Sequence, residues 1–110
     1  MGKDFDELYK QAHDLIPKEL EVKLPSINEA MGQKNPVCPI KIFGGPATFW
    51  VAGRDDDYLW GVAEIFERET GSFLLSELQS IKVPPLNLPL ERDLYYEPKT
   101  ISEIMSGRGL

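Results

Sequence analysis

The sequence predicts an α+β domain, a small antiparallel β-sheet of about four strands with short helices packed mainly on one face. Two apolar and aromatic runs, at 48–52 and 58–66, flank the polar segment 53–57, which is typical of an antiparallel hairpin. Short stretches with helical spacing stand before and after this hairpin, and prolines or glycines end most of them. A chain of 110 residues can bury one modest core, so we expect a single domain over 1–110.

An amphipathic helix is expected within residues 1–16, as an extension at the N-terminus. Apolar side chains recur there three and four residues apart, on one helical face: Phe5, Leu8, Tyr9, Ala12, Leu15 and Ile16. Asp4 is a good N-cap for the first turn. Pro17 cannot continue this helix but can open a second short one over 18–23, which Pro25 ends.

Two more short helices are predicted from local capping patterns. Segments 26–29 and 100–103 have the Ser/Thr-x-x-Glu spacing of a capping box. A first strand is expected at 40–43. The Gly-Gly pair at 44–45 turns the chain into the hairpin, since it lacks the Lys-Ser/Thr of a phosphate-binding loop. Residues 107–110 are expected to form a frayed tail.

Beyond the hairpin the pattern becomes less regular. A turn is predicted at 67–71, followed by a short strand at 72–75 that runs directly into a helix at 76–81. The proline-rich stretch 83–91 offers few N–H donors for a ladder, so we expect an extended loop. A last strand is predicted at 93–97.

Alternation along the hairpin places apolar side chains on both faces of the sheet. Trp50 alternates with apolar neighbours in the first strand, and Trp60 does so in the second. We expect too little helix to cover both faces in so small a chain. A residual exposed patch around Trp50, Tyr58 or Trp60 would then be a partner site or a dimer interface.

The composition is that of an acidic, water-soluble globular protein. No apolar run approaches the roughly 20 residues that span a bilayer, and the N-terminus has no signal-peptide pattern, so we expect no membrane partner. The net charge of −6 argues against direct nucleic-acid binding, which needs clustered Lys and Arg. The single cysteine, Cys38, cannot form an internal disulfide and favours a cytoplasmic location.

The densest set of acidic residues surrounds the hairpin turn: Asp55, Asp56, Asp57, Glu64, Glu67 and Glu69. Three consecutive acids point in different directions and lack the alternating ligands of a calcium loop, so we interpret them as a solvated tip. His13, the only histidine, falls on the polar face of the first helix, and Cys38 is expected to be a buried, inert thiol. Arg92 is expected to pair with a neighbouring acid and pin the proline-rich stretch. We predict no catalytic residue, no metal and no cofactor.

The run Leu-Pro-Leu-Glu-Arg-Asp-Leu-Tyr-Tyr-Glu-Pro at 88–98 is the most specific part of a wider likeness, which includes Leu-Ile-Pro-Lys-Glu-Leu at 15–20 and Thr-Phe-Trp-Val at 48–51. Over residues 15–104 the chain resembles a small bacterial family known as domain-of-unknown-function family 2958. The resemblance implies a protein carried by plasmids, phages and integrative elements, often beside genes for transfer or for evading host defence. It implies no activity and no catalytic residue.

The chain departs from the family pattern at two positions. Leu74 stands where a serine is expected to cap the next helix, so Ser72 or Ser76 would have to supply that cap. Gly53 stands where a glutamate is expected after the Trp50 strand. If that acid takes part in chemistry in the family, this chain lacks it.

We therefore expect a non-enzymatic, protein-binding accessory protein of a mobile genetic element, which inhibits a host defence or nucleic-acid-processing complex. An acidic surface can occupy the basic channel of such a complex. The expected partner-binding residues are acidic and aromatic: Trp50, Asp55, Asp56, Asp57, Tyr58 and Trp60. Two alternatives stay open, a small metal-dependent hydrolase that uses the acidic hairpin and a homodimeric structural module.

Overall fold

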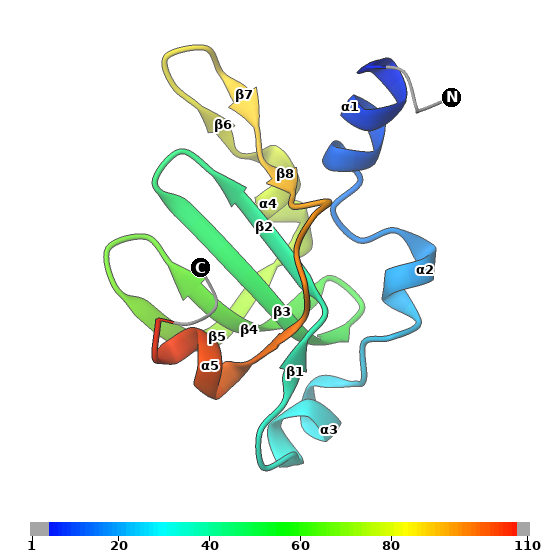
Figure 1. The fold of residues 1–110 in the computed structure, drawn as a ribbon, viewed down its shortest axis with the longest axis vertical. Helices are drawn as coiled ribbons and strands as arrows, with labels where there is room; N and C mark the ends of the chain where they lie inside the picture. Colours follow the sequence, from blue (N-terminus) through cyan, green and yellow to red (C-terminus); the bar gives the residue numbers. More distant parts are fainter. Residues whose placement is uncertain (1–4, 108–110) are drawn as a thin grey trace.

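A five-stranded antiparallel sheet lies at the centre of the computed structural model, which describes residues 5–107 (Figure 1). Its strand order is β5-β4-β3-β2-β8, and the antiparallel pairing confirms the predicted α+β class. The strands are β2 (Ile40–Gly44), β3 (Ala47–Asp55), β4 (Tyr58–Glu64), β5 (Arg68–Leu74) and β8 (Glu91–Arg92). The sheet has one strand more than predicted, because β8 begins at the last residue of the proline-rich stretch 83–91 and pairs with β2 at the edge of the sheet.

The predicted central hairpin is formed by β3 and β4. They pair from Thr48 opposite Glu64 to Asp55 opposite Tyr58, with an irregularity in register after Val51. The side-chain alternation along both strands follows the predicted period of two.

Close approach of β3 and β4 depends on Gly61, which lies opposite Val51. A Cβ added to Gly61 would lie 1.9 Å from the carbonyl oxygen of Trp50 and 3.1 Å from the amide nitrogen of Ala52. Both atoms belong to the β3 backbone, which cannot move away without breaking the ladder. A side chain at this position is therefore incompatible with the hairpin.

β5 begins earlier than predicted. The expected turn at 67–71 is already strand in the structure, since Arg68 pairs with Glu64. β5 is an edge strand whose outward side chains face solvent, so its polar residues do not show an apolar alternation. α4 (Leu75–Ser80) follows β5 without a loop, as predicted.

Apolar clusters fill both faces of the sheet. One cluster packs beside α4 and the segment that contains α2 (Lys18–Glu21), and its buried residues are Leu15, Ile40, Ile42, Phe49, Val51, Leu59, Leu75, Leu78 and Leu90. The other cluster draws on α3 (Ile27–Gly32), β1 (Val37–Cys38) and α5 (Ile101–Met105), and its buried residues are Ala30, Cys38, Trp50, Ala52, Val62 and Ile104.

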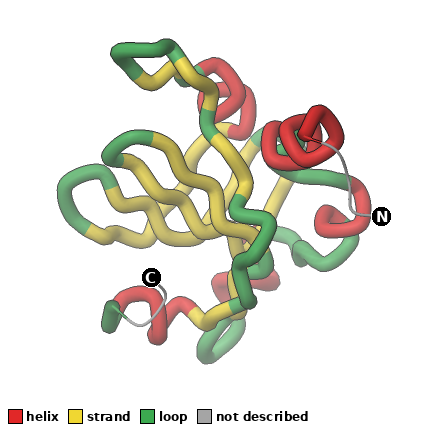
Figure 2. The backbone as a smooth tube through the Cα atoms, turned by 45° about the horizontal axis from the view of Figure 1, so that its top comes forward, coloured by secondary structure: helices red, strands yellow, loops and turns green. Residues whose placement is uncertain are grey.

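Helices thus lie over both faces of the sheet rather than mainly over one. Figure 2 shows them (red) on several sides of the strands (yellow). α3 and α5 have six and five residues, and each contributes a single fully buried side chain, Ala30 and Ile104. Segments this short show no helical periodicity, which is why sequence reasoning underestimates the cover on the second face.

Two short ladders lie outside the main sheet. β1 pairs with β9 (Lys99–Thr100), and β6 (Lys82–Val83) pairs with β7 (Leu88–Pro89). The predicted extended loop at 83–91 is therefore in part a small hairpin, and this β6–β7 arm projects from the sheet at the top of Figure 1.

The strand predicted at 93–97 is a turn in the structure. The carboxylate of Asp93 accepts a hydrogen bond from the backbone N–H of Tyr95 at 2.9 Å. This side-chain-to-backbone bond closes an Asx turn, which redirects the chain. The β-propensity of the two tyrosines is overridden by the local hydrogen bond that Asp93 offers.

Both predicted capping boxes are present. Ser26 accepts a hydrogen bond from the N–H of Glu29 at 3.2 Å, and Thr100 accepts one from the N–H of Glu103 at 3.2 Å. In each box the glutamate accepts in return from the N–H of the cap residue. Side chains of neighbouring residues in the sequence therefore provide acceptors for N–H groups at the starts of α3 and α5, which have no partner inside the helix.

α1 (Phe5–His13) occupies part of the predicted helical stretch 1–16. Its predicted N-cap, Asp4, lies outside the described residues, as does most of the predicted tail at 107–110. Within residues 5–107, no helix is long and apolar enough to cross a membrane.

We predict that Gly61→Ala destabilises the domain by more than about 2 kcal/mol, because the new methyl group collides with the β3 backbone. Gly71 is the matched control, since it pairs with Gly61 and a Cβ there meets nothing within 4 Å. Gly71→Ala should be neutral or should stabilise by up to about 1 kcal/mol. Urea unfolding followed by circular dichroism measures both variants, and equal midpoints would contradict this account of the hairpin.

Candidate functional site

The acidic turn between β3 and β4 is tied to α4 through Asp57. The Asp57 carboxylate accepts hydrogen bonds from the Ser76 N–H at 2.9 Å and from the Ser76 hydroxyl at 2.5 Å. The backbone carbonyl of Asp57 accepts one from the Leu75 N–H at 2.9 Å. These N–H groups belong to the first turn of α4 and have no partner inside the helix. The predicted cap by Ser72 or Ser76 is therefore wrong, because Ser76 is a donor and Asp57 supplies the acceptor.

The first half of the same turn is tied to α2 and α3. A carboxylate oxygen of Asp55 accepts a hydrogen bond at 3.3 Å from the N–H of Ile27, the first residue of α3. The N–H of Arg54 donates to the carbonyl of Pro25 at 2.9 Å. The Arg54 guanidinium also lies 3.4 Å from the carboxylate of Glu21 in α2.

The three predicted acidic residues of the turn thus have separate environments. Asp55 and Asp57 direct their carboxylates to α3 and α4, which contribute to opposite faces of the sheet. Asp56 is exposed, with a left-handed φ of 52° at the tip of the turn. Among the residues from 5 to 107, no group of three or more His, Cys, Asp and Glu side chains is arranged to hold a metal ion.

The predicted aromatic surface is only partly present. Trp50 is 1% exposed, with the Arg68 guanidinium 5.2 Å from the centroid of its ring, so its expected place on an exposed patch is corrected to the core. Trp60 is half-buried, and Tyr58 is exposed. The exposed members of the predicted set are therefore Asp55, Asp56 and Tyr58, whereas α3, β1 and α5 cover the face that carries Trp50.

Gly53, the second departure from the family pattern, lies where α3 packs on β3. A Cβ added to Gly53 would lie 2.9 Å from the Ala30 side chain and 3.2 Å from the Cα of Ile27. A glutamate at this position would require α3 to shift. The glycine therefore has a packing role in this chain.

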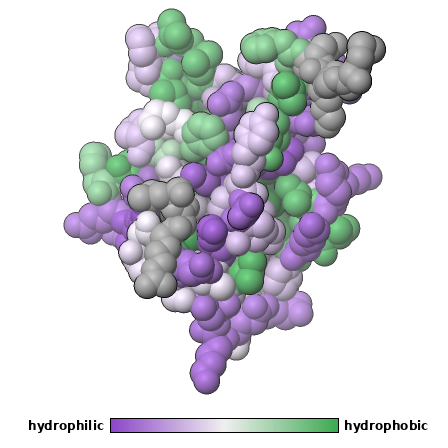
Figure 3. Space-filling view, viewed as in Figure 1, coloured by the Kyte–Doolittle hydropathy of each residue, from purple (hydrophilic) through white to green (hydrophobic). Residues whose placement is uncertain are grey.

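An apolar cleft lies between α1 and the β6–β7 arm. Two adjoining hollows of about 250 and 330 Å³ share the side chains of Phe5, Tyr9, Phe43 and Glu91. Figure 3 shows the opening at the top of the molecule, between hydrophobic side chains (green) on either side. Phe5 is 80% exposed and Tyr9 is 49% exposed, although both are large apolar groups. Exposed apolar surface of this kind around a concavity is typical of interaction sites.

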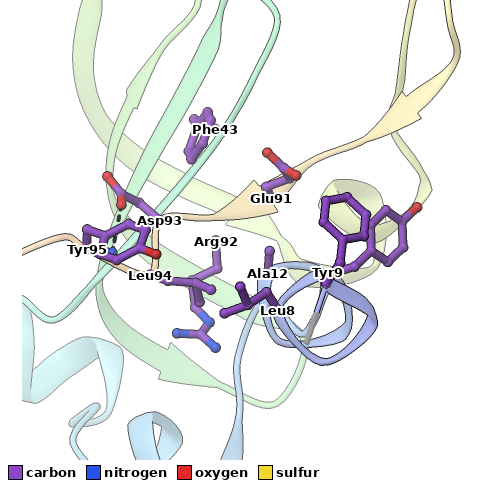
Figure 4. A pocket seen from close by; sticks show the side chains of 10 residues that line it. Leu8, Tyr9, Ala12, Phe43, Glu91, Arg92, Asp93, Leu94 and Tyr95 are labelled. Atoms are coloured by element: carbon purple, nitrogen blue, oxygen red, sulfur yellow. Dashed lines mark hydrogen bonds between the residues drawn. The ribbon is translucent and has the colours of Figure 1, made fainter. Parts of the chain in front are cut away.

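Two acidic residues line this cleft, Asp93 in one hollow and Glu91 in both. Glu91 lies opposite Phe43 in the β2–β8 ladder, so the two side chains leave the sheet on the same side. The Glu91 carboxylate forms no hydrogen bond or ion pair with any residue of the described chain, although the side chain is only half-exposed. Figure 4 shows its carboxylate pointing away from the Arg92 guanidinium.

Arg92 holds α1 in place beside the cleft. Its guanidinium donates to the carbonyl oxygens of Asp14 at 2.9 Å and Gln11 at 3.0 Å, at the C-terminal end of α1. A cation at this end complements the partial negative charge of the helix terminus. The predicted pairing of Arg92 with an acid is wrong, because its donors are directed to backbone carbonyls. α1 itself has no fully buried residue, so the two hydrogen bonds from Arg92 are a main part of its attachment to the sheet.

The remaining residues of the 88–98 run are largely structural. Leu90 is buried in the core. The Tyr96 hydroxyl donates a hydrogen bond to the Cys38 carbonyl oxygen at 2.7 Å and accepts one from the Lys99 N–H at 3.0 Å. Burial raises the pKa of the Tyr96 phenol and raises the pKa of the Cys38 thiol to about 12. Both groups therefore stay protonated at neutral pH, and Cys38 is buried as predicted.

The fold and this cleft define an α+β domain with an open, aromatic-lined surface site. Residues 15–106 match the family model described as Protein of unknown function (DUF2958), so the chain belongs to this family. The match confirms the resemblance found in the sequence, and it begins after α1. No curated protein and no solved structure matches the chain.

We predict that Asp57→Ala lowers the free energy of unfolding by about 1–2 kcal/mol, because it leaves the N–H and the hydroxyl of Ser76, in the first turn of α4, without their carboxylate acceptor. Glu67→Ala is the control, since Glu67 is an exposed acid of the next turn and has no partner in the described chain. That variant should change stability by less than about 0.5 kcal/mol. Chemical unfolding measures both, and an Asp57→Ala variant as stable as Glu67→Ala would show that the cap is dispensable.

Proposed function

We propose that this protein is a non-enzymatic binding protein that recognises a protein partner through the cleft between α1 and the β6–β7 arm. The observation that carries the proposal is the exposure of Phe5, Tyr9 and Phe43 around a concavity that also contains an unpaired carboxylate. Protein interfaces are enriched in aromatic side chains at their centres. The occupant of the cleft is a segment of the partner with apolar side chains.

This proposal moves the binding surface away from the acidic turn. Asp55 and Asp57 already accept hydrogen bonds from helix N-termini, and Trp50 is in the core. A partner that used these groups would compete with the fold. The cleft residues, by contrast, are apolar groups that are left exposed and gain from burial.

The proposed setting is counter-defence on a mobile genetic element, with a host defence or nucleic-acid-processing protein as the partner. This part rests on the family resemblance. It is supported by the net charge of −6, because proteins that process nucleic acids carry basic surfaces, to which an acidic protein is steered.

We predict that Tyr9→Ala/Phe43→Ala weakens capture of the partner at least about tenfold, since truncation of central aromatic residues at interfaces typically costs about 2 kcal/mol. Tyr58→Ala is the matched control, because Tyr58 is an exposed aromatic residue on the far turn of the sheet. The measurement is affinity purification from the native host with three tagged baits, quantified by mass spectrometry.

The proposal predicts that the wild-type and Tyr58→Ala baits enrich the same partner protein and that the Tyr9→Ala/Phe43→Ala bait does not. Thermal unfolding of the three baits checks that each is folded. Equal enrichment by all three baits, loss confined to Tyr58→Ala, or no enrichment by the wild type would contradict it.

A further inference from the structure

The Glu91 carboxylate lies among apolar and aromatic side chains. It lines both hollows of the cleft, where most of the surrounding surface is apolar. A carboxylate that is partly removed from water and has no partner is costly, and a cation placed beside it relieves that cost. Glu91 therefore favours a positively charged occupant.

The cationic side chains of Arg92, next to Glu91 in β8, and of Lys41 in β2 are already engaged. Arg92 donates to the carbonyls of Gln11 and Asp14, and Lys41 lies 3.7 Å from Asp93. Figure 4 shows Arg92 directed away from Glu91. The other titratable groups that line the cleft are Tyr9, Tyr95 and His13. The His13 Nδ1 lies 2.8 Å from the Tyr9 carbonyl oxygen, and its ring packs on the Tyr9 ring at 4.1 Å between centroids.

Aromatic rings complete the surroundings of this carboxylate. Phe43 is its neighbour across the ladder, and Phe5 and Tyr9 line the same two hollows from α1. The face of an aromatic ring attracts cations, and a planar guanidinium can stack on a ring while it donates to a carboxylate. An ammonium group is more strongly hydrated and stacks less well.

We propose that the cleft receives an arginine side chain of the partner, with its guanidinium on the Glu91 carboxylate and its faces against the aromatic rings. This inference rests on the proposed function and specifies the chemistry of its partner. The partner segment carries apolar residues beside the arginine, which contact Phe43 and the inner side of the β6–β7 arm. An exposed arginine flanked by apolar residues fits the basic class of partner proposed above.

The test uses three blocked peptides, acetyl-Leu-Arg-Leu-amide and its versions with lysine or glutamine in the centre. Each is titrated into the ¹⁵N-labelled full chain and followed by NMR. We expect saturable shifts of the backbone amides of Tyr9, Phe43 and Glu91 with the arginine peptide. The dissociation constant should be at least about tenfold higher for the glutamine peptide.

Glu91→Gln is the informative variant, because it keeps the shape of the side chain and removes its charge. It should weaken binding of the arginine peptide at least about tenfold. Glu67→Gln is the control, since Glu67 also lies beside exposed apolar residues in another hollow and should have no effect. The inference is overturned if Glu91→Gln and the wild type bind the arginine peptide with equal affinity, if the wild type binds the arginine and glutamine peptides equally, or if no saturable shift is seen. Tighter binding of the lysine peptide than of the arginine peptide overturns the choice of arginine.

A Glu91→Gln bait in the capture experiment separates this inference from the proposed function. If Tyr9→Ala/Phe43→Ala loses the partner and Glu91→Gln keeps it, the cleft binds a protein and the arginine assignment is wrong. If Tyr9→Ala/Phe43→Ala keeps the partner, the proposed function itself fails. Light scattering at increasing concentration tests a second copy as the occupant, and a dimer that Glu91→Gln abolishes would overturn the assignment to a partner protein.

Discussion

The hydrogen bonds of the turn between β3 and β4 hold helices against both faces of the sheet. α3 and α4 have six residues each, too few to be stable without outside partners, and their first N–H groups need acceptors. Asp55 and Asp57 supply these acceptors from one turn, one toward each helix. The Arg54 N–H, just before this turn, donates a hydrogen bond to the Pro25 carbonyl, so the same region of the hairpin also fixes the path of the chain before α3.

Features encoded by neighbours in the sequence could be predicted, and features that depend on distant partners could not. The alternation of the hairpin and the two capping boxes involve residues at most a few positions apart, so their patterns are visible in the sequence. Asp57 and Ser76 are 19 residues apart, and no local pattern links them. The burial of Trp50 likewise results from short segments that come from distant parts of the chain, so the expected exposure was wrong for Trp50, whereas Tyr58 is exposed.

The most specific stretch of the family resemblance divides its residues between the interior and the surface. Leu90, Arg92 and Tyr96 hold the core, α1 and β1 in place, whereas Glu91 and Tyr95 face the cleft. Around β8 the alternation of an extended chain directs Leu90 and Glu91 to opposite sides, whereas Tyr95 lines the cleft from the turn that the Asp93 carboxylate closes. Sequence reasoning identified the stretch but assigned the binding role to the acidic turn, because a run of charges is conspicuous in a sequence and a single half-buried glutamate is not.

The direct test of the turn as the point that joins sheet and helices is NMR detection of scalar couplings across its hydrogen bonds. In a long-range HNCO experiment on the uniformly labelled chain, the account predicts a correlation from the Leu75 amide nitrogen to the Asp57 carbonyl carbon and from the Arg54 nitrogen to the Pro25 carbonyl carbon. Correlations across the β3–β4 ladder serve as the internal reference. Observation of the ladder correlations without these two would contradict the account.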